Sequence, residues 1–404
     1  MFIRRKSSYL TLIFSSPAFF AAACVPPDDV AVHESEDDAQ STNGLSSVNG
    51  LSSVNGLSSV NGLSSVNGLS SVNGLADGIG LMSSTSGRST VTYLVRCALP
   101  AGRSITKRDQ HGFPHTYAGQ IGVAPQWETG ACDTTCQEHI SACMLAHVNT
   151  TGRKIRLWLD SDSSALGWGR STDFPYQEGS FFGNIFTSPP KAYFCNGKDF
   201  DQGAVPGRLG VGTSGAPFTN PFGNGAYCKD RCQAADAPNG DDGYKSCNGF
   251  DHVVTVWRNF DPYTDYRVCS RATGQCLDVD QARTNDGAQV VQWPINGGRN
   301  QRWRIKQASP GRYTFMNVNS GKMLDVHGGW SGDGANLVQW TANGALHQQW
   351  TFTPTGDGYY KFSPVSQLNG SLDVPNGSTT AGTRIQQWTW TGTPWQHWSI
   401  TPIN

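Results

Sequence analysis

Three triplets near the C-terminal end of the chain, Leu277-Asp278-Val279, Leu324-Asp325-Val326 and Leu372-Asp373-Val374, have the same order of residues. Their leucines stand 47 (324 − 277) and 48 (372 − 324) residues apart. Sixteen residues after each leucine comes the tryptophan of a Gln-Trp pair, at Gln292-Trp293, Gln339-Trp340 and Gln387-Trp388. Each copy then ends in a Gln-x-Trp, at Gln301–Trp303, Gln348–Trp350 and Gln396–Trp398. A period of this length indicates one supersecondary unit copied three times, in which no copy can bury its apolar side alone.

The three copies have the character of strands rather than helices. Each is punctuated by Gly and Asn, and short apolar pieces such as 289–293 and 336–340 are typical of strands. Three copies of a unit of about four strands predict a closed β architecture with three-fold pseudo-symmetry.

Length and composition limit the class of protein. The 404 residues are enough for two or three domains, and the net charge of −1 gives no basic field to attract nucleic acid or anionic lipid. The chain is rich in Gly (47) and Trp (13) but only 15% charged, which favours β-rich or loop-rich secreted domains.

Residues 1–23 have the pattern of a secretory signal peptide. A basic segment, 4–6, precedes an apolar stretch, 9–20, and the small residues 21–23 are typical of a cleavage site. The stretch is too short to span a membrane. Cleavage would leave Cys24 at the new N-terminus, and Ala-Ala-Ala-Cys resembles a bacterial lipobox, which implies lipidation of Cys24. Plain secretion is the alternative.

Residues 24–88 are expected to form a disordered linker. An acidic stretch, 25–40, is followed by the hexamer Ser-Ser-Val-Asn-Gly-Leu, repeated over 41–75. The copies are too few to bury the core of a β-solenoid, so the segment is interpreted as a flexible low-complexity spacer.

Residues 89–260 predict a small, disulfide-rich α+β domain. Strands are expected at 90–95, 154–159 and 253–257, and a helix at 134–147, capped by Asp133 or Thr134. Setting Cys24 aside leaves an even number of cysteines, as expected of disulfides in an oxidising compartment. Cys269 and Cys276 are close enough for a local disulfide, whereas the pairing of the others stays open: Cys97, Cys132, Cys136, Cys143, Cys195, Cys228, Cys232 and Cys247.

The triplicate marks of residues 262–404 resemble the ricin B-type β-trefoil lectin family, and are similar to carbohydrate-binding module family 13. The resemblance implies a β-trefoil that binds galactose- or xylose-type sugars in shallow pockets, one per repeat. Residue chemistry agrees, because an ionised Asp accepts charge-assisted hydrogen bonds from sugar hydroxyls and a Trp face stacks on the C–H face of a pyranose. The implied sugar-binding residues are Asp278, Trp293, Asn300, Gln301, Asp325, Trp340, His347, Gln348, Asp373, Gln386, Trp388 and Gln396.

The three implied pockets differ. Val291 and Val338 stand two residues before the Trp, where the family often has Gln and where the third repeat keeps Gln386. His347 and Trp395 occupy the position at which the family usually has the Asn that the first repeat keeps, Asn300. The pockets therefore rank first, second, third. The tryptophans of the Gln-x-Trp marks are expected in the core, whereas Trp293, Trp340 and Trp388 are either sugar platforms or buried packing.

No catalytic family is recognised in residues 89–260. The 212–217 segment echoes the surroundings of a serine-protease nucleophile, but Ser214 and His147 are too close in sequence for a double-barrel protease. No metal motif is recognised, and no cofactor is expected. Many carboxylates are present, yet nothing selects two of them as a glycosidase pair.

The sequence thus predicts a carbohydrate-binding lectin that is secreted or anchored by a lipid at the bacterial cell surface. An outer-membrane lipoprotein is one form that this prediction allows. The predicted partner is a polysaccharide or surface glycan, and no nucleic acid is expected to bind. The alternative is an extracellular hydrolase in residues 89–260 that the trefoil targets to polysaccharide.

Overall fold

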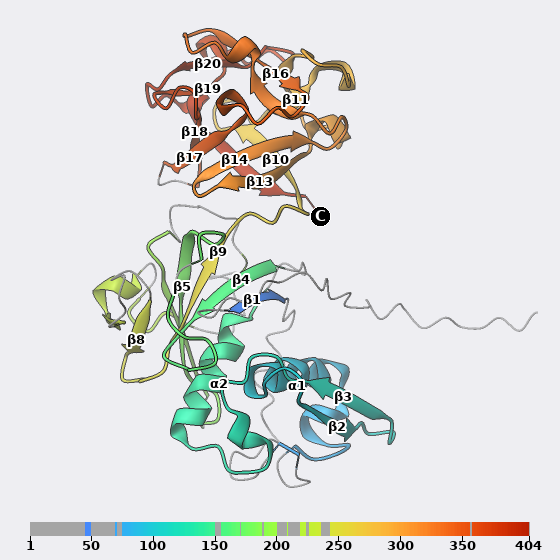
Figure 1. The fold of residues 1–404 in the computed structure, drawn as a ribbon, viewed down its shortest axis with the longest axis vertical. Coiled ribbons are helices and arrows are strands. Elements are labelled where there is room, and N and C mark those ends of the chain that lie inside the picture. Colours follow the sequence, from blue (N-terminus) through green and yellow to red (C-terminus); the bar gives the residue numbers. More distant parts are fainter. Residues whose placement is uncertain are drawn as a thin grey trace, which may run out of the picture. The chain divides into compact units, whose positions relative to one another are not determined.

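The computed structural model describes residues 45–49, 69–70, 75–149, 155–169, 171–187, 190–199, 208, 219–223, 226–235, 243–355 and 358–403 (Figure 1). All of them belong to one compact unit, residues 40–404. None of the helices in these ranges combines the length and the apolar character that a membrane span requires.

The N-terminal part of this unit contains two α-helices, α1 (Thr85–Ala98) and α2 (Thr134–Ala146). The expected strand at 90–95 is wrong, because these residues lie within α1. Val91, Leu94, Val95 and Ala98 are fully buried along one face at helical spacing, and this burial outweighs the β-branched composition. The expected helix at 134–147 is confirmed as α2, and the side chain of Asp133 caps it by accepting the N–H of Cys136 at 2.9 Å.

A five-stranded antiparallel sheet has the order β1-β4-β9-β5-β6. Its strands are β1 (Leu45–Asn49), β4 (Ile155–Asp160), β5 (Tyr176–Asn184), β6 (Lys191–Asn196) and β9 (Val254–Arg258). The expected strands at 154–159 and 253–257 are confirmed as β4 and β9. Two hairpins accompany the sheet, β2 (Ser104–Arg108) with β3 (Pro114–Ala118) and β7 (Cys232–Ala234) with β8 (Tyr244–Cys247).

Parts of the expected linker are ordered. Strand β1 lies within the hexamer repeat and pairs with the edge of β4, and the side chains of Leu69 and Leu75 are fully buried in the core beside α1 and α2. Packed structure therefore begins before residue 89. Residues 1–44, which include the predicted signal peptide and Cys24, lie outside the described residues.

The expected disulfides are confirmed. Cys269 bonds to Cys276, as the sequence predicts, and the structure supplies the pairing that the sequence leaves open. The other pairs are Cys97–Cys143, Cys132–Cys136, Cys195–Cys228 and Cys232–Cys247.

The three repeats form a β-trefoil, drawn in orange to red in Figure 1. Six strands pair in a closed ring: β10 (Asp265–Ser270), β13 (Trp303–Ser309), β14 (Arg312–Asn317), β17 (Trp350–Pro354), β18 (Tyr360–Pro364) and β21 (Trp398–Pro402). Three hairpins complete it: β11 (Cys276–Val279) with β12 (Val290–Trp293), β15 (Met323–Val326) with β16 (Ala335–Trp340), and β19 (Gly370–Asp373) with β20 (Gln386–Thr389). The closed ring leaves its strands no free edge.

Short 3₁₀ turns join the strands and helices. They are η2 (Gly80–Ser83), η3 (Pro125–Glu128), η4 (Cys228–Asp230), η5 (Asp280–Ala282), η6 (Arg299–Gln301), η7 (His327–Gly329), η8 (Leu346–Gln348), η9 (Pro375–Gly377) and η10 (Pro394–Gln396). In the trefoil, η6, η8 and η10 hold the glutamines of the three Gln-x-Trp marks.

The tryptophans of the Gln-x-Trp marks lie in the trefoil core, as expected. Trp303, Trp350 and Trp398 are fully buried. Their indole N–H groups donate to the carbonyls of Leu277, Leu324 and Leu372, the leucines of the first mark, at 3.2, 3.1 and 3.0 Å. Each pair joins the end of a repeat to its own hairpin, and satisfies the polar atom of a large buried side chain.

The glutamines of the Gln-Trp marks link neighbouring repeats, and we call these three residues the glutamine clamp. The side-chain amides of Gln292, Gln339 and Gln387 are fully buried. Each donates to two backbone carbonyls of the preceding repeat in the ring, at 2.6 to 3.3 Å. Gln292 donates to Ser378 and Thr380, Gln339 to Arg283 and Asn285, and Gln387 to Ser331 and Gly332. The repeats are therefore joined cyclically by buried hydrogen bonds.

We expect Gln339→Met to lower the free energy of unfolding by about 1–3 kcal/mol, because the carbonyls of Arg283 and Asn285 lose a buried donor. Methionine has a similar shape, so the change removes hydrogen bonds rather than packing. Denaturant unfolding of the full chain measures the loss.

Gln349→Met is the matched control, since Gln349 donates to the carbonyl of Gly344 at 3.0 Å from a more exposed position. This variant should stay within about 0.5 kcal/mol of the wild type. Equal losses in the two variants would contradict a special role for the clamp.

Candidate carbohydrate-binding sites

The register of the three hairpins separates the residues of each mark onto two faces. Leu277 lies opposite Gln292 across the first hairpin, whereas Asp278 lies opposite Val291 and Cys276 opposite Trp293. The other two hairpins have the same register. Because side chains alternate along a strand, Asp and Trp share one face of each hairpin while Leu and Gln share the other. The structure thus brings together the predicted carboxylate and aromatic of each pocket.

In the first pocket, two amides hold the carboxylate. Asn300 Nδ2 donates to Asp278 Oδ1 at 2.7 Å, and Gln301 Nε2 donates to Asp278 Oδ2 at 2.9 Å. Gln301 is buried and its Oε1 accepts the N–H of Asn296, so the amide is fixed from both ends. Burial raises the pKa of Asp278, and the hydrogen bonds from Gln301 and Asn300 offset this only in part.

In the second pocket, an imidazole replaces the asparagine. Gln348 Nε2 donates to Asp325 Oδ2 at 2.8 Å, and His347 Nδ1 lies 3.2 Å from the same oxygen. Burial raises the pKa of Asp325, while Gln348 and His347 oppose that rise. No hydrogen bond to Asp325 Oδ1 is found within the part of the chain that the structure describes, so this oxygen retains its acceptor capacity.

In the third pocket, the amide next to the carboxylate comes from the hairpin itself. Gln386 lies directly across the hairpin from Asp373 and donates to its Oδ2 at 2.7 Å. Trp395, which replaces the asparagine, packs partly buried against the trefoil core rather than standing free. Gln396 is buried and bonds to the backbone of Thr389 and Thr391. Burial raises the pKa of Asp373 as well, offset in part by Gln386 and Gln396.

The tryptophans of the Gln-Trp marks are not buried packing. Trp293, Trp340 and Trp388 are 41%, 37% and 40% exposed. One edge of each indole covers a glycine of the preceding repeat, where a Cβ would lie 3.4 Å (Gly382), 3.5 Å (Gly287) or 3.9 Å (Gly334) from the ring. These glycines have a positive φ as well, so a larger residue there would be both strained and close to the indole.

Two groups near the pockets could not be recognised from the sequence marks. In the sequence, each glutamine of the glutamine clamp looks like a polar residue on the solvent side of a strand. It is buried because the neighbouring repeat covers it. In the second repeat, the His327 ring lies 6.3 Å from that of Trp340, and Trp330 at the end of the same loop is 62% exposed. A lone Trp after Gly328 and Gly329 is the sequence signal that would have identified this added aromatic surface.

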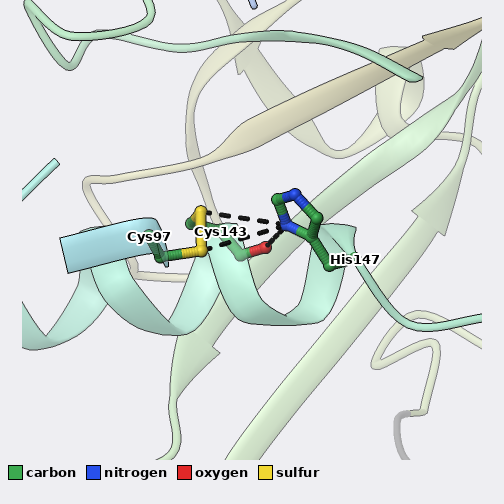
Figure 2. A group of neighbouring side chains, drawn as sticks. All are labelled: Cys97, Cys143 and His147. Atoms are coloured by element: carbon green, nitrogen blue, oxygen red, sulfur yellow. Dashed lines mark hydrogen bonds between the residues drawn. A yellow bond between two sulfur atoms is a disulfide. The ribbon is translucent and has the colours of Figure 1, made fainter. Parts of the chain in front are cut away.

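The structure gives no support to a Ser–His pair in the N-terminal part. Ser214 lies outside the described residues. His147 is fully buried at the end of α2, where its Nδ1 donates to the carbonyl of Cys143 at 2.7 Å and lies 3.9 Å from both sulfurs of the Cys97–Cys143 disulfide (Figure 2). Burial lowers the pKa of His147 to about 3, so the ring is neutral at neutral pH and sealed from substrate.

Several carboxylates of the N-terminal part serve structural roles. Glu178 is buried between Arg208 and Arg258 at 2.6 and 2.8 Å, and Asp160 accepts the indole N–H of Trp257 at 2.7 Å. Glu128 pairs with Arg103 at 2.6 Å. These carboxylates are held by cations or N–H donors, and none of these contacts joins them as a glycosidase pair.

Comparisons with known proteins agree with the geometry. The family model described as "Ricin-type beta-trefoil lectin domain-like" matches residues 255–340 and 346–404. No curated protein matches the chain.

Similar solved structures include a designed three-fold symmetric protein, ThreeFoil, which is 38% identical over 34% of this chain and 99% of its own, with a TM-score of 0.34. The agglutinin of Rhizoctonia solani is 20% identical over 36% of this chain and 99% of its own, with a TM-score of 0.33. An exo-β-1,3-galactanase from Clostridium thermocellum is 24% identical over 61% of this chain and 55% of its own, with a TM-score of 0.35.

The family match and the closed ring of three repeats support one another. Residues 255–404 belong to the ricin-type β-trefoil lectin-like family, whose fold supports a glycan-binding role for this part of the chain.

Proposed function

We propose that residues 262–404 bind galactose- or xylose-type glycans through one pocket per repeat, the first pocket being the strongest. The observation that carries the proposal is that each hairpin presents a buried carboxylate and a partly exposed indole on the same face. A fixed carboxylate next to an open aromatic surface suits a pyranose, which offers hydroxyl groups on its edge and C–H groups on its face.

Acceptor capacity supports the first pocket. Each oxygen of Asp278 accepts one amide hydrogen bond, whereas an ionised carboxylate has about four acceptor sites. The remaining sites suit two neighbouring sugar hydroxyls. Asn300 also donates to the carbonyl of Val279 at 3.2 Å, which fixes the amide beside the site.

The third pocket is proposed as the weakest. Trp395 brings an indole in place of the asparagine, so the third pocket lacks the amide that Asn300 supplies next to Asp278. The second pocket lies between the two, because His347 retains a polar group next to Asp325.

Multivalent binding to a polymer follows from three sites on one rigid domain. A single site with a millimolar dissociation constant contributes only about −4 kcal/mol. Once one pocket is bound, a repeating polysaccharide presents further sugars at a raised effective concentration. A polysaccharide or glycan-coated surface therefore suits this chain better than a free monosaccharide.

Secretion and an N-terminal lipid complete the proposal. Both rest on the sequence of residues 1–24, and the hexamer repeat would then connect the binding domain to the cell surface. Mass measurement of the protein recovered from its own membranes, compared with Cys24→Ser, tests the lipid. A wild-type mass without an acyl chain would contradict it.

The pocket residues can be tested in the full chain with a galactose- or xylose-containing oligosaccharide short enough to fill one pocket. We expect Asp278→Asn combined with Trp293→Ala to remove binding at the first site. Loss of a charge-assisted hydrogen bond alone corresponds to about 10- to 100-fold in affinity. Calorimetric titration gives the affinity and the number of sites.

Tyr263→Ala is the control, because Tyr263 is an exposed aromatic residue outside the three hairpins. It should bind as the wild type does. If the number of sites and the affinity stay at wild-type values after the double change together with Asp325→Asn and Trp340→Ala, in protein whose denaturant unfolding is unchanged, the pocket assignment is wrong. A polysaccharide pull-down whose supernatant is assayed for released sugar separates retention from hydrolysis.

Acidification should act on binding and on stability in opposite directions. Sugar binding needs ionised Asp278, whose pKa is raised by burial, so affinity should fall at a higher pH than an ordinary aspartate would give. For stability, the folded carboxyl binds a proton more tightly than the unfolded one. Its contribution to the free energy of unfolding therefore increases as pH falls through the raised pKa.

Affinity and denaturant unfolding measured across this pH range, for the wild type and Asp278→Asn, test both signs. The stability of the wild type relative to the variant should rise on acidification while sugar affinity falls. A fall in both would contradict the raised pKa.

A further inference from the structure

Two histidines and an aspartate from three separate segments meet at the surface of the N-terminal part. His139 lies on α2, Asp162 follows the end of β4, and His252 precedes β9. Strands β4 and β9 pair with Asp160 opposite Thr255, which places the last two segments side by side, and α2 packs against β9. The topology therefore converges on this cluster, which we call the His–Asp–His site.

The donor atoms of the site lie close together. His139 Nε2 is 3.3 Å from Asp162 Oδ1, and His252 Nδ1 is 2.5 Å from Asp162 Oδ2. The two imidazole rings stack with their centroids 3.9 Å apart, and one ligand atom of each residue lies within 4.8 Å of the others. The side chains of His139, Asp162 and His252 are 12%, 29% and 17% exposed, so the site is partly shielded from solvent.

Two imidazoles face a single carboxylate at this site, one on each of its oxygens. A divalent cation can replace the protons, since it brings two positive charges to a point that both nitrogens and the carboxylate can reach. Elsewhere in the same part of the chain, His115 pairs with Asp109 at 3.0 Å as an ordinary pair with one imidazole.

The backbone around the site is held in place by hydrogen bonds. Glu138, the neighbour of His139, accepts the backbone N–H of Asp251, the neighbour of His252, at 3.0 Å. This bond joins the two histidine-bearing segments. The loop of Asp162 is closed by the N–H of Ser161, which donates to the carbonyl of Gly167 at 3.0 Å.

Disulfides fix two of the three segments further. Cys132–Cys136 spans the first turn of α2, and Cys232–Cys247 anchors the segment that leads to His252. A ligand set that is oriented before the ion arrives loses little conformational entropy on binding.

The distances suit a small transition-metal ion. Zinc bonds to nitrogen and carboxylate oxygen at about 2.0–2.2 Å, so two ligand atoms at a tetrahedral angle lie ~3.4 Å apart. The 3.3 Å between His139 and Asp162 already matches this value. The 2.5 Å between His252 and Asp162 would lengthen toward this value when the ion replaces the shared proton. Two imidazoles with one carboxylate favour zinc-like ions over Mg²⁺ and Ca²⁺, which prefer all-oxygen sites.

We propose that His139, Asp162 and His252 bind a divalent transition-metal ion of the zinc class, with at least one coordination position open to water. Three protein ligands and an open position are the arrangement of metal sites that take up an exchangeable ligand rather than of closed structural sites. No local sequence motif marks this site, because 23 residues separate His139 from Asp162 and 90 separate Asp162 from His252.

Titration of the chelator-treated, oxidised full chain with Zn²⁺ tests the proposal. We expect one site that is lost in His252→Ala and in Asp162→Asn, and that is weakened roughly 10- to 100-fold in Glu138→Ala, which removes the acceptor of the Asp251 N–H. Co²⁺ in place of zinc should give the visible absorption of a nitrogen- and oxygen-bound ion, without a thiolate charge-transfer band.

His115→Ala is the matched control, since it removes a histidine from a His–Asp pair without a second imidazole, and it should keep the site. The proposal fails if the wild type binds no more Zn²⁺ than His252→Ala, or if His115→Ala loses as much. If His252→Ala does not fold, Zn²⁺ binding by Asp162→Asn and the Co²⁺ spectrum of the wild type test the proposal instead. A thiolate charge-transfer band, or a Co²⁺ spectrum that does not differ from that of the ion in water, would overturn the proposal.

Discussion

The trefoil depends on one interaction made three times, the buried clamp of Gln292, Gln339 and Gln387 on the backbone of the preceding repeat. A single repeat cannot satisfy these amides, because the carbonyls that accept them belong to its neighbour. A buried amide without a partner costs about 1–3 kcal/mol, so the clamp favours the closed ring over any open array. Gln387 shows a departure from symmetry, since its Oε1 finds no donor within the described residues, whereas Gln292 and Gln339 each accept a hydroxyl.

The clamp also explains why the pockets can differ. Strand alternation places Leu and Gln on the face that holds the repeats together, and Asp and Trp on the other face. Differences between the first and third repeats, such as Val291 against Gln386 and Asn300 against Trp395, therefore alter the pockets without altering the closed ring. The carboxylates of Asp286 and Asp333 accept the backbone N–H groups of Thr341 and Thr389, the residues that follow Trp340 and Trp388. The third junction lacks this hydrogen bond, because Ala381 and Pro294 occupy the corresponding positions.

The trefoil and its pocket residues could be predicted from the sequence because the marks repeat three times in register. The burial of Gln292 could not, since its partners Ser378 and Thr380 lie in another repeat. In the N-terminal part, the β-branched residues 90–95 favour a strand locally, yet one buried face makes them helical in α1. The disulfide pairing and the His–Asp–His site join segments that are distant in sequence, and no local pattern reports such contacts.

The central claim is that each repeat contains one tryptophan for the fold and one for the sugar. Nuclear magnetic resonance of the indole N–H groups during titration with a galactose- or xylose-containing oligosaccharide tests it most directly. The account predicts that the signals of Trp293 and Trp340 move with the sugar, while those of Trp303, Trp350 and Trp398, whose N–H groups are bonded in the core, stay in place. Unmoved signals from Trp293 and Trp340 at saturating sugar, or equal shifts in the core signals, would contradict it.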